Sequence, residues 1–466
     1  MQLTPRLIGP FIVGWVVVWS ASSVAARRRH GYVDEATEAQ EEAAADGEPD
    51  VAAAKPKKKS PPKRDEGDGA GEADDADGEA NHEAADDDVE ADDASGAKRA
   101  GPTMSASSAL SAYSDTDSVH VITPTIAGDI RDDVAGWSVG GRYLVDAVSA
   151  ASVDIVSSAS GHWTEVRNVG SAEAAVKSGA LGIGLAGGFS HEPDYLSVGG
   201  GGTLSVETLD KNVTPFIGAS YGHDDVGRTG LSKAYWHTMQ KGTVQLGVTF
   251  VVDKSTIAAV AVDGIFERGY LAKPYRYIPL FAPGIAAAIQ PGASITEVNA
   301  LRLDLRPVDA LPDARDRYAL GGRIAHRFDA STVRADGRLY HDNWGMTAVT
   351  GDARLLLDVG ERFMLWPHAR FHAQQGVDLW QRAYQAPPAP DGTPTIPRYR
   401  TGDRELGPLY TWTAGAGARA RIVDGRRQSW SLTFEVEGIF SRYLDALYIT
   451  QRRALFGNLS LEATFE

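Results

Sequence analysis

The chain of 466 residues contains no cysteine, which excludes a disulfide framework, a cysteine-ligated zinc site and a thiol nucleophile. Beyond the N-terminus no apolar run reaches about 18 residues, the length at which one helix spans a bilayer, so a bundle of membrane helices is excluded too. The chain also lacks a phosphate-binding glycine loop and a dinucleotide fingerprint followed by a helix. We therefore expect no cofactor.

The N-terminus has the layout of a secretory signal peptide. Arg6 precedes an apolar stretch, and small residues follow up to Val24-Ala25-Ala26, which suits a signal peptidase. The sequence predicts a signal peptide over residues 1–26, cleaved near Ala26, and hence an exported protein. The alternative is an uncleaved helical anchor, which the three arginines directly after Ala26 leave open.

A strongly acidic segment comes next. Residues 34–100 hold 23 acidic and 8 basic side chains and almost no large apolar ones, so this segment cannot bury enough surface to offset its ordering entropy. We predict a disordered, acidic, low-complexity periplasmic extension over residues 27–112. It accounts for most of the net charge of −16. Its clustered charge makes it a candidate tether for a periplasmic protein.

The remainder of the chain alternates apolar and polar residues with a period of two. In one run, Trp137, Val139 and Tyr143 share a face, and Ser138 and Arg142 lie on the other. The same pattern recurs around residues 244–252, 430–437 and 459–465. Strands with one apolar and one polar face need one side in an apolar medium and the other in water.

The length and spacing of these runs favour an outer-membrane barrel. Many run for 10–14 residues, and a tilted strand needs about 9–11 residues to cross a bilayer. Tight turns alternate with long connections at 222–238, 268–314, 374–407 and 441–451, as in outer-membrane barrels. A soluble sandwich or barrel is the alternative. We predict an all-β, antiparallel transmembrane barrel over residues 113–466, with an even number of strands near 14 (range 12–16). Two further runs, 118–127 and 297–306, would raise the count to sixteen.

Several motifs resemble an uncharacterised bacterial outer-membrane family, catalogued as domain of unknown function 3570. The resemblance covers roughly residues 113–466 and implies a β-barrel, but no activity or catalytic residue. Its motifs are Gly136 to Asp146, Val148 to Ser157, Glu192-Pro193-Asp194-Tyr195-Leu196-Ser197, Phe266-Glu267-Arg268-Gly269, Lys273-Pro274-Tyr275-Arg276-Tyr277, Arg315-Asp316-Arg317-Tyr318-Ala319-Leu320, and Thr401-Gly402-Asp403-Arg404-Glu405-Leu406-Gly407-Pro408-Leu409.

Charged residues on the polar faces should point into the lumen. Arginines outnumber acids there, which predicts a wet passage with a mild preference for anions. The alternative is a set of salt bridges that braces a closed interior. The lumen-lining candidates are Arg142, Arg323, Arg327, Arg334, Asp336, Arg338, Arg354, Asp358, Arg370, Glu435 and Glu437.

No arrangement of residues makes a convincing active site. Gly218-Ala219-Ser220-Tyr221-Gly222 has the letters of a nucleophile elbow, which requires a strand-to-helix turn, and here no helix follows. His223-Asp224-Asp225 is a weak candidate for a divalent cation or for a hydrolase site. We therefore expect no enzyme.

The leading functional hypothesis is a pore, or an export or uptake component, for small polar solutes in the outer membrane. The alternatives are a plugged structural or assembly barrel that recruits a periplasmic partner, and an outer-membrane hydrolase. The expected partners are outer-membrane lipid and the barrel-assembly machinery. No nucleic acid is expected.

Overall fold

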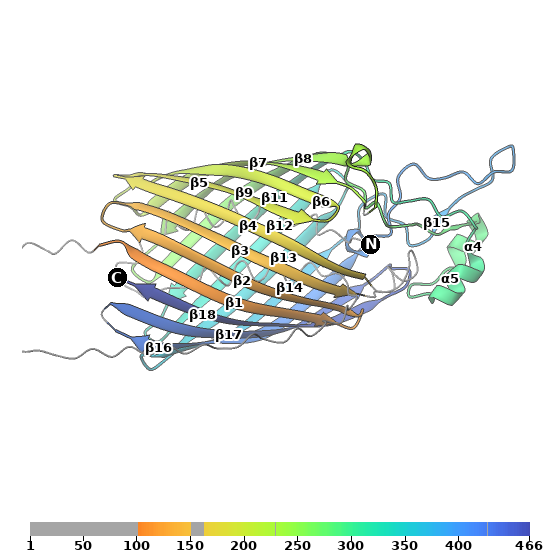
Figure 1. Cartoon of the computed structure of the whole chain (residues 1–466). Helices are drawn as coiled ribbons and strands as arrows, with labels where there is room; N and C mark the ends of the chain where they lie inside the picture. Colours follow the sequence, from red (N-terminus) through yellow and green to blue (C-terminus); the bar gives the residue numbers. More distant parts are fainter. Residues whose placement is uncertain (1–100, 151–162, 229, 426) are drawn as a thin grey trace, which may run out of the picture. The chain divides into compact units, whose positions relative to one another are not determined.

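In a computed structural model, the chain forms one closed antiparallel barrel of sixteen strands (Figure 1). The structure describes residues 101–150, 163–228, 230–425 and 427–466. The barrel strands are β1 (Thr103–Asp115), β2 (Val119–Asp132), β3 (Trp137–Ala150), β4 (Trp163–Ser178), β5 (Leu181–Glu192), β6 (Tyr195–Val206), β7 (Val213–Val226), β8 (His237–Val251), β9 (Thr256–Gly269), β11 (Ala314–Arg327), β12 (Ser331–Asp342), β13 (Thr347–Val359), β14 (Phe363–Gln374), β16 (Leu409–Asp424), β17 (Gln428–Tyr443) and β18 (Gln451–Phe465).

The ring closes where β1 pairs with β18, from Met104 opposite Phe465 to Asp115 opposite Ala454. All other pairs of neighbouring strands in the ring are antiparallel too. Each long strand pairs with the long strands that come directly before and after it in the chain. The predicted fold class, an all-β antiparallel barrel, is therefore confirmed, and the strand number lies at the top of the predicted range.

The two further runs that the sequence offered as strands had different outcomes. The run 118–127 is indeed a strand and belongs to β2, but the run 297–306 is not, because Ile295–Leu301 forms helix α5. The sixteenth strand is β1, which begins at Thr103, ten residues before the predicted start of the barrel at 113. Its outward positions are mostly Ala and Ser, so its apolar alternation is weak.

Alternation sorts the side chains of each strand to the two faces of the barrel. On β2, Ile122 and Ile126 are 54% and 61% exposed on the outer face, whereas Thr123 is buried on the inner face. Large apolar side chains are exposed in the same way on every barrel strand from β1 to β18. Exposed apolar side chains around a closed sheet form the surface that hydrocarbon tails cover.

The two ends of the barrel differ. The short turns that follow the even-numbered strands β2 to β8, and those after β11, β13 and β16, lie at the end that holds Thr103 and Phe465. In barrels of this class the short turns are periplasmic. The long connections lie at the other end, where β10 (Leu280–Phe281) pairs in parallel with β15 (Tyr384–Gln385).

Helices α4 (Pro283–Ala288) and α5 lie at this extracellular end, opposite the C-terminus in Figure 1. Two short 3-10 helices, η1 (Lys233–Tyr235) and η2 (Arg404–Leu406), belong to the same set of loops. Among the described residues, none of the helices has the length and apolar character needed to cross a membrane. The predicted signal peptide and the predicted tail up to residue 100 lie outside the described residues.

We expect the folded protein to require detergent for extraction and to migrate faster on a gel before boiling than after it. The reason is that all barrel strands are paired around the ring, so detergent finds no open edge from which to unfold the sheet. Semi-native electrophoresis measures the shift. Recovery of the protein in the soluble periplasmic fraction would contradict the membrane assignment.

Candidate functional site: the lumen and its outer mouth

Ion pairs cover one part of the inner wall. Asp336 of β12 accepts hydrogen bonds from Arg323 of β11 and from Arg334 of its own strand, the latter at 2.9 Å. Arg327 of β11 pairs with Asp358 of β13. The inner faces of β11, β12 and β13 thus carry alternating positive and negative groups, and much of the predicted arginine excess is offset by neighbouring acids.

Other pairs reach over an intervening strand. Arg338 of β12 lies 3.2 Å from Asp263 of β9, across β11. Trp366 Nε1 of β14 donates to Glu435 of β17 at 3.1 Å, across β16. Side chains that span two strand spacings meet most readily on the concave face of a barrel. These contacts therefore place the polar face of β9 to β17 inside.

His368 of β14 is enclosed on this wall, with a side chain that is 1% exposed. Its Nε2 lies 2.7 Å from Asp352 of β13, and its Nδ1 faces Glu437 of β17. The sequence analysis did not single out His368, although its period-two spacing with Trp366 and Arg370 placed it on the same face. The histidine joins three strands of the wall.

The remaining predicted lining residues lie on the same inner face. Arg354 of β13 is buried, 4.0 Å from Asp352, and Arg370 of β14 lies close to His372. Arg142 of β3 is half-buried on the face that also carries Asp146, which pairs with Arg167 at 2.6 Å.

Water-accessible charge occurs at the periplasmic rim of the wall and near its middle. The side chains of Arg327 and Asp358, at the periplasmic ends of β11 and β13, are 33% and 30% exposed, and that of Arg338, near the middle of β12, is 31% exposed, although each is engaged in an ion pair. Buried apolar clusters in the described residues lie mainly at the extracellular end; the pair Phe216 and Ala261 is the exception. A sixteen-strand barrel is wide enough to leave an aqueous channel unless something fills it.

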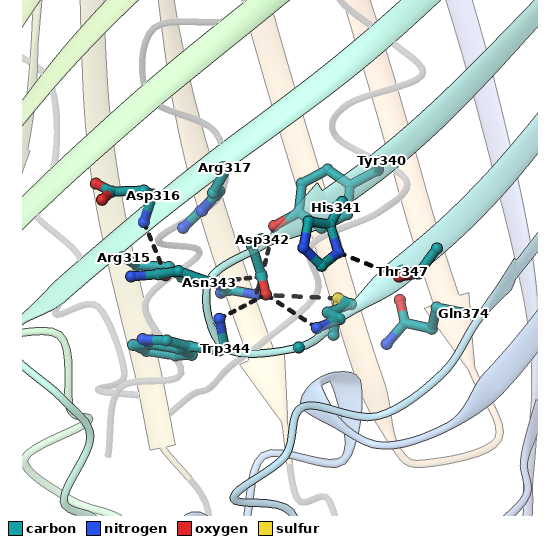
Figure 2. Close-up of polar contacts among 12 residues, drawn as sticks. Arg315, Asp316, Arg317, Tyr340, His341, Asp342, Asn343, Trp344, Thr347 and Gln374 are labelled. Carbon is teal, nitrogen blue, oxygen red and sulfur yellow. Dashed lines mark hydrogen bonds and ion pairs between the residues drawn. The ribbon is translucent and has the colours of Figure 1, made fainter.

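At the extracellular end, Asp342 organises the rim between β11 and β13 (Figure 2). Arg315 donates to Asp342 from Nε at 2.9 Å, and Tyr340 donates to it at 2.8 Å. The backbone N–H groups of Trp344 and Met346 donate to its other oxygen at 3.0 Å each. Arg315 also lies over the Trp344 ring, 4.4 Å from the centroid. This network makes the rim a fixed base against which the loops pack.

The two longest loops, 270–313 and 375–408, are tied together by a buried ionic cluster. Asp403 lies 2.7 Å from Lys273 Nζ and 3.0 Å from Arg276 Nη1. Burial alone would raise the pKa of Asp403, but Arg276 and Lys273 outweigh it and hold that pKa well below its usual range. Asp309, which accepts from the Lys273 backbone N–H at 3.0 Å, has a pKa raised mainly by burial.

The loop 375–408 also contacts opposite sides of the mouth. Arg404 pairs with Asp117 in the β1–β2 turn, and both are buried. Two residues later, Leu406 belongs to a buried apolar cluster with Met239 of β8 and Trp344 of the β12–β13 turn. Because β8 is on the far side of the ring from β1, this loop crosses the outer mouth.

The loop 270–313 makes a second crossing. Tyr275 packs with Tyr113 of β1, Val119 of β2 and Phe456 of β18, and its hydroxyl donates to Asp194 in the β5–β6 turn. Asp194 lies in a buried carboxylate group with Glu165 and Glu192. The two loops together cover the mouth. Several residues that hold them there, among them Lys273, Tyr275, Asp403 and Arg404, were quoted above only as motifs of the family resemblance.

The predicted His223-Asp224-Asp225 site is not assembled. Alternation along β7 turns Asp224 inward, where it accepts from Tyr195 at 2.8 Å and Ser197 at 2.7 Å. His223 and Asp225 face outward, 3.4 Å apart and substantially exposed. Three consecutive residues of a strand cannot share a face, so the structure does not bring these three side chains together.

Gly218 to Gly222, whose letters match a nucleophile elbow, belong to a strand. These residues lie within β7 and pair with both β6 and β8. No strand-to-helix turn is formed there, so Ser220 has the setting of an ordinary strand residue.

Comparisons with known proteins found a matching family and similar solved structures. The family described as "Protein of unknown function (DUF3570)" matches residues 157–436, which confirms the resemblance. No curated protein matches the chain. Solved structures with a similar chain path include a bacterial polysaccharide outer membrane secretin (10% identity, 78% of this chain and 98% of that chain, TM-score 0.39) and the anion-selective porin from Comamonas acidovorans (8% identity, 78% and 98%, TM-score 0.33). CdiB from Acinetobacter baumannii is similar over 77% of this chain and 60% of its own (8% identity, TM-score 0.39).

Proposed function

We propose that this chain, which belongs to the protein family of unknown function DUF3570, forms an outer-membrane pore for small polar solutes whose outer mouth is narrowed by two loops. The observation that carries the proposal is the charged inner wall. Arg338, near the middle of β12, stays 31% exposed inside the sheet, and Arg327 and Asp358, at the periplasmic ends of β11 and β13, are 33% and 30% exposed. A charged group inside the sheet is stable only where water reaches it.

The loops define how the pore would work. Loops 270–313 and 375–408 cross the mouth and are joined by Asp403, Lys273 and Arg276. A solute therefore has to pass these loops at the outer mouth. We infer low conductance in the resting protein, with the loops and not the wall as the limiting barrier.

A plugged barrel without transport is the second candidate. It is favoured by the depth of the contacts at the mouth, where Arg404, Asp117 and Leu406 are all buried. In that case the proposed disordered tail, with its clustered charge, would recruit a periplasmic protein and give the barrel its role. Neither candidate assigns catalysis to the chain, and both include delivery by the barrel-assembly machinery after signal-peptide cleavage.

Ion selectivity tests the pore. Replacing Arg323 and Arg334 by Glu should shift the reversal potential in a salt gradient toward cations, because both side chains flank Asp336 on the inner wall. The shift should shrink at high salt, as the Debye length falls from about 10 Å at 0.1 M to about 3 Å at 1 M. Planar-bilayer recording measures it.

The matched control replaces Arg362, in a periplasmic turn, and Arg398, in an extracellular loop, by Glu; both are exposed. This control should leave the selectivity close to that of the unaltered protein. Equal shifts in both variants would mean that total charge, and not the wall, sets the selectivity. A complete absence of single-channel steps, with the loops intact and also with them released, would favour the plugged barrel.

A further inference from the structure

The lipid-facing surface carries an uneven distribution of basic groups between its two ends. Seven arginine or histidine side chains lie within four residues of the extracellular ends of their strands and on the outer face. We call this set the outer rim belt: His120 of β2, His191 of β5, His223 of β7, Arg268 of β9, His341 of β12, Arg442 of β17 and Arg453 of β18.

The belt adjoins the apolar band of the barrel directly. Two positions further into the membrane, the same face of five of these strands carries a large exposed apolar or aromatic side chain. These are Ile122 (54% exposed), Phe189 (44%), Tyr221 (54%), Leu339 (57%) and Leu455 (59%). Because the hydrocarbon boundary falls where the apolar side chains end, the belt lies at the level of the lipid headgroups.

The periplasmic end has no comparable belt. In the described strands its outward positions are mainly aromatic or aliphatic, among them Trp137, Phe363 and Phe465, and His326 is the one histidine. Basic residues at that end, such as Lys254, Arg362 and Arg427, lie in the turns beyond the strands, and Arg421, at the bulge in β16, pairs with Asp424 at 3.1 Å. General anchoring at an interface would give both ends similar residues, so the asymmetry indicates a ligand present in one leaflet.

Most of the belt is available to a ligand. The side chains of Arg268 and His223 are 50% and 43% exposed, although Arg268 pairs with Asp316 and His223 lies 3.4 Å from Asp225. His120 and His341 use Nδ1 for contacts with Ser114 at 2.9 Å and Thr347 at 3.2 Å, and Figure 2 shows the latter pair at the rim. Each Nε2 remains directed away from that contact.

We propose that the outer rim belt binds phosphate groups of lipids in the outer leaflet. Guanidinium groups donate paired hydrogen bonds to phosphate oxygens, and imidazole adds single donors. Asp225 and Asp316 at the same level pair with His223 and Arg268 and so weaken the attraction at those two positions. Such contacts would fix the depth and rotation of the barrel in its leaflet, whether or not the lumen conducts.

The test uses the full chain in an uncharged detergent, with dioleoyl phosphatidic acid as the probe and dioleoylglycerol as its phosphate-free counterpart. Native mass spectrometry counts the bound lipids. The unaltered protein should retain phosphatidic acid and not dioleoylglycerol. Replacing Arg268, Arg442 and Arg453 by Gln should weaken retention about a hundredfold, as expected for three basic groups near an anionic surface.

The control replaces Lys254, Arg362 and Arg427, exposed residues of periplasmic turns, by Gln and should keep the lipid. Equal losses in both variants, or none in the belt variant, would overturn the proposal. Displacement by inorganic phosphate at the probe's concentration would also overturn it, in favour of a soluble-anion site. Loss of the heat-dependent gel shift would mean that the belt variant has not folded. In that case the unaltered protein is tested at high salt, which should release the lipid.

Discussion

Replacing Arg404 by Ala should raise the single-channel conductance several-fold and lengthen the open intervals. Arg404 pairs with Asp117 on one side of the mouth and lies 5.1 Å from the centre of the Tyr443 ring. Removing one partner of a buried ion pair costs about 3–5 kcal/mol, since the other charge stays buried. A loss of that size releases the loop 375–408 from the β1–β2 turn. Planar-bilayer recording gives the conductance directly.

Arg398 provides the matched control for this experiment. It belongs to the same loop but is exposed and stacks on its neighbour Tyr399, so Arg398→Ala should conduct like the unaltered protein. If Arg404→Ala also leaves the conductance unchanged while the gel shift is retained, the loop is not the barrier. Deletion of 375–408 would then separate a barrier elsewhere in the lumen from a barrel with no passage.

Truncation from the N-terminal side should leave barrel assembly intact up to about residue 103 and abolish it beyond that residue. A chain that lacks residues 27–100 should assemble with the normal heat-dependent gel shift. A chain that lacks residues 27–112 should not, because it loses most of β1, which pairs with both β18 and β2. Unpaired strand edges are not tolerated in hydrocarbon, so the ring cannot close.

The gel shift and protease resistance of the two truncated proteins measure this boundary. Failure of the shorter truncation would show that the segment before residue 101 takes part in assembly. Normal assembly of the longer truncation would contradict the sixteen-strand ring, because the barrel would then close without β1.

The strands that sequence analysis placed best have large apolar side chains on one face. In β8 and β17 most of the outward residues are branched or aromatic, so a period of two is visible without further information. In β1 the outward positions include Ala106, Ser108 and Ala112, whose small side chains carry almost no such signal. This strand depends on its pairing with β18, which is more than 300 residues away.

The run 297–306 shows the opposite error. Arg302 and Arg306 have the spacing of a strand face, but Ser294 lies three residues before Glu297 and accepts its backbone N–H at 3.2 Å. A Ser followed three residues later by Glu is a helix-start pattern. Local capping therefore outweighed the alternation of charges, and α5 formed.

The charged wall was foreseeable residue by residue, but its pairing was not. Alternation put Arg323, Arg334 and Asp336 on one face, and only the register of β11 and β12 shows that Arg323 lies directly opposite Asp336. The contacts at the outer mouth were even harder to predict from the sequence. Asp117 and Arg404 are 287 residues apart, and no local pattern reports such a contact.

Thiol labelling tests the water-filled lumen most directly. Because the chain contains no cysteine, only the introduced thiol can react. Ala325 and Ile324 are neighbours on β11 whose side chains point to opposite faces, Ile324 being 48% exposed on the outside. In bilayers, a charged water-soluble thiol reagent should modify the variant Ala325→Cys rapidly and Ile324→Cys slowly. Slow modification at both positions, in a protein with the normal gel shift, would show a dry or filled interior and contradict the pore.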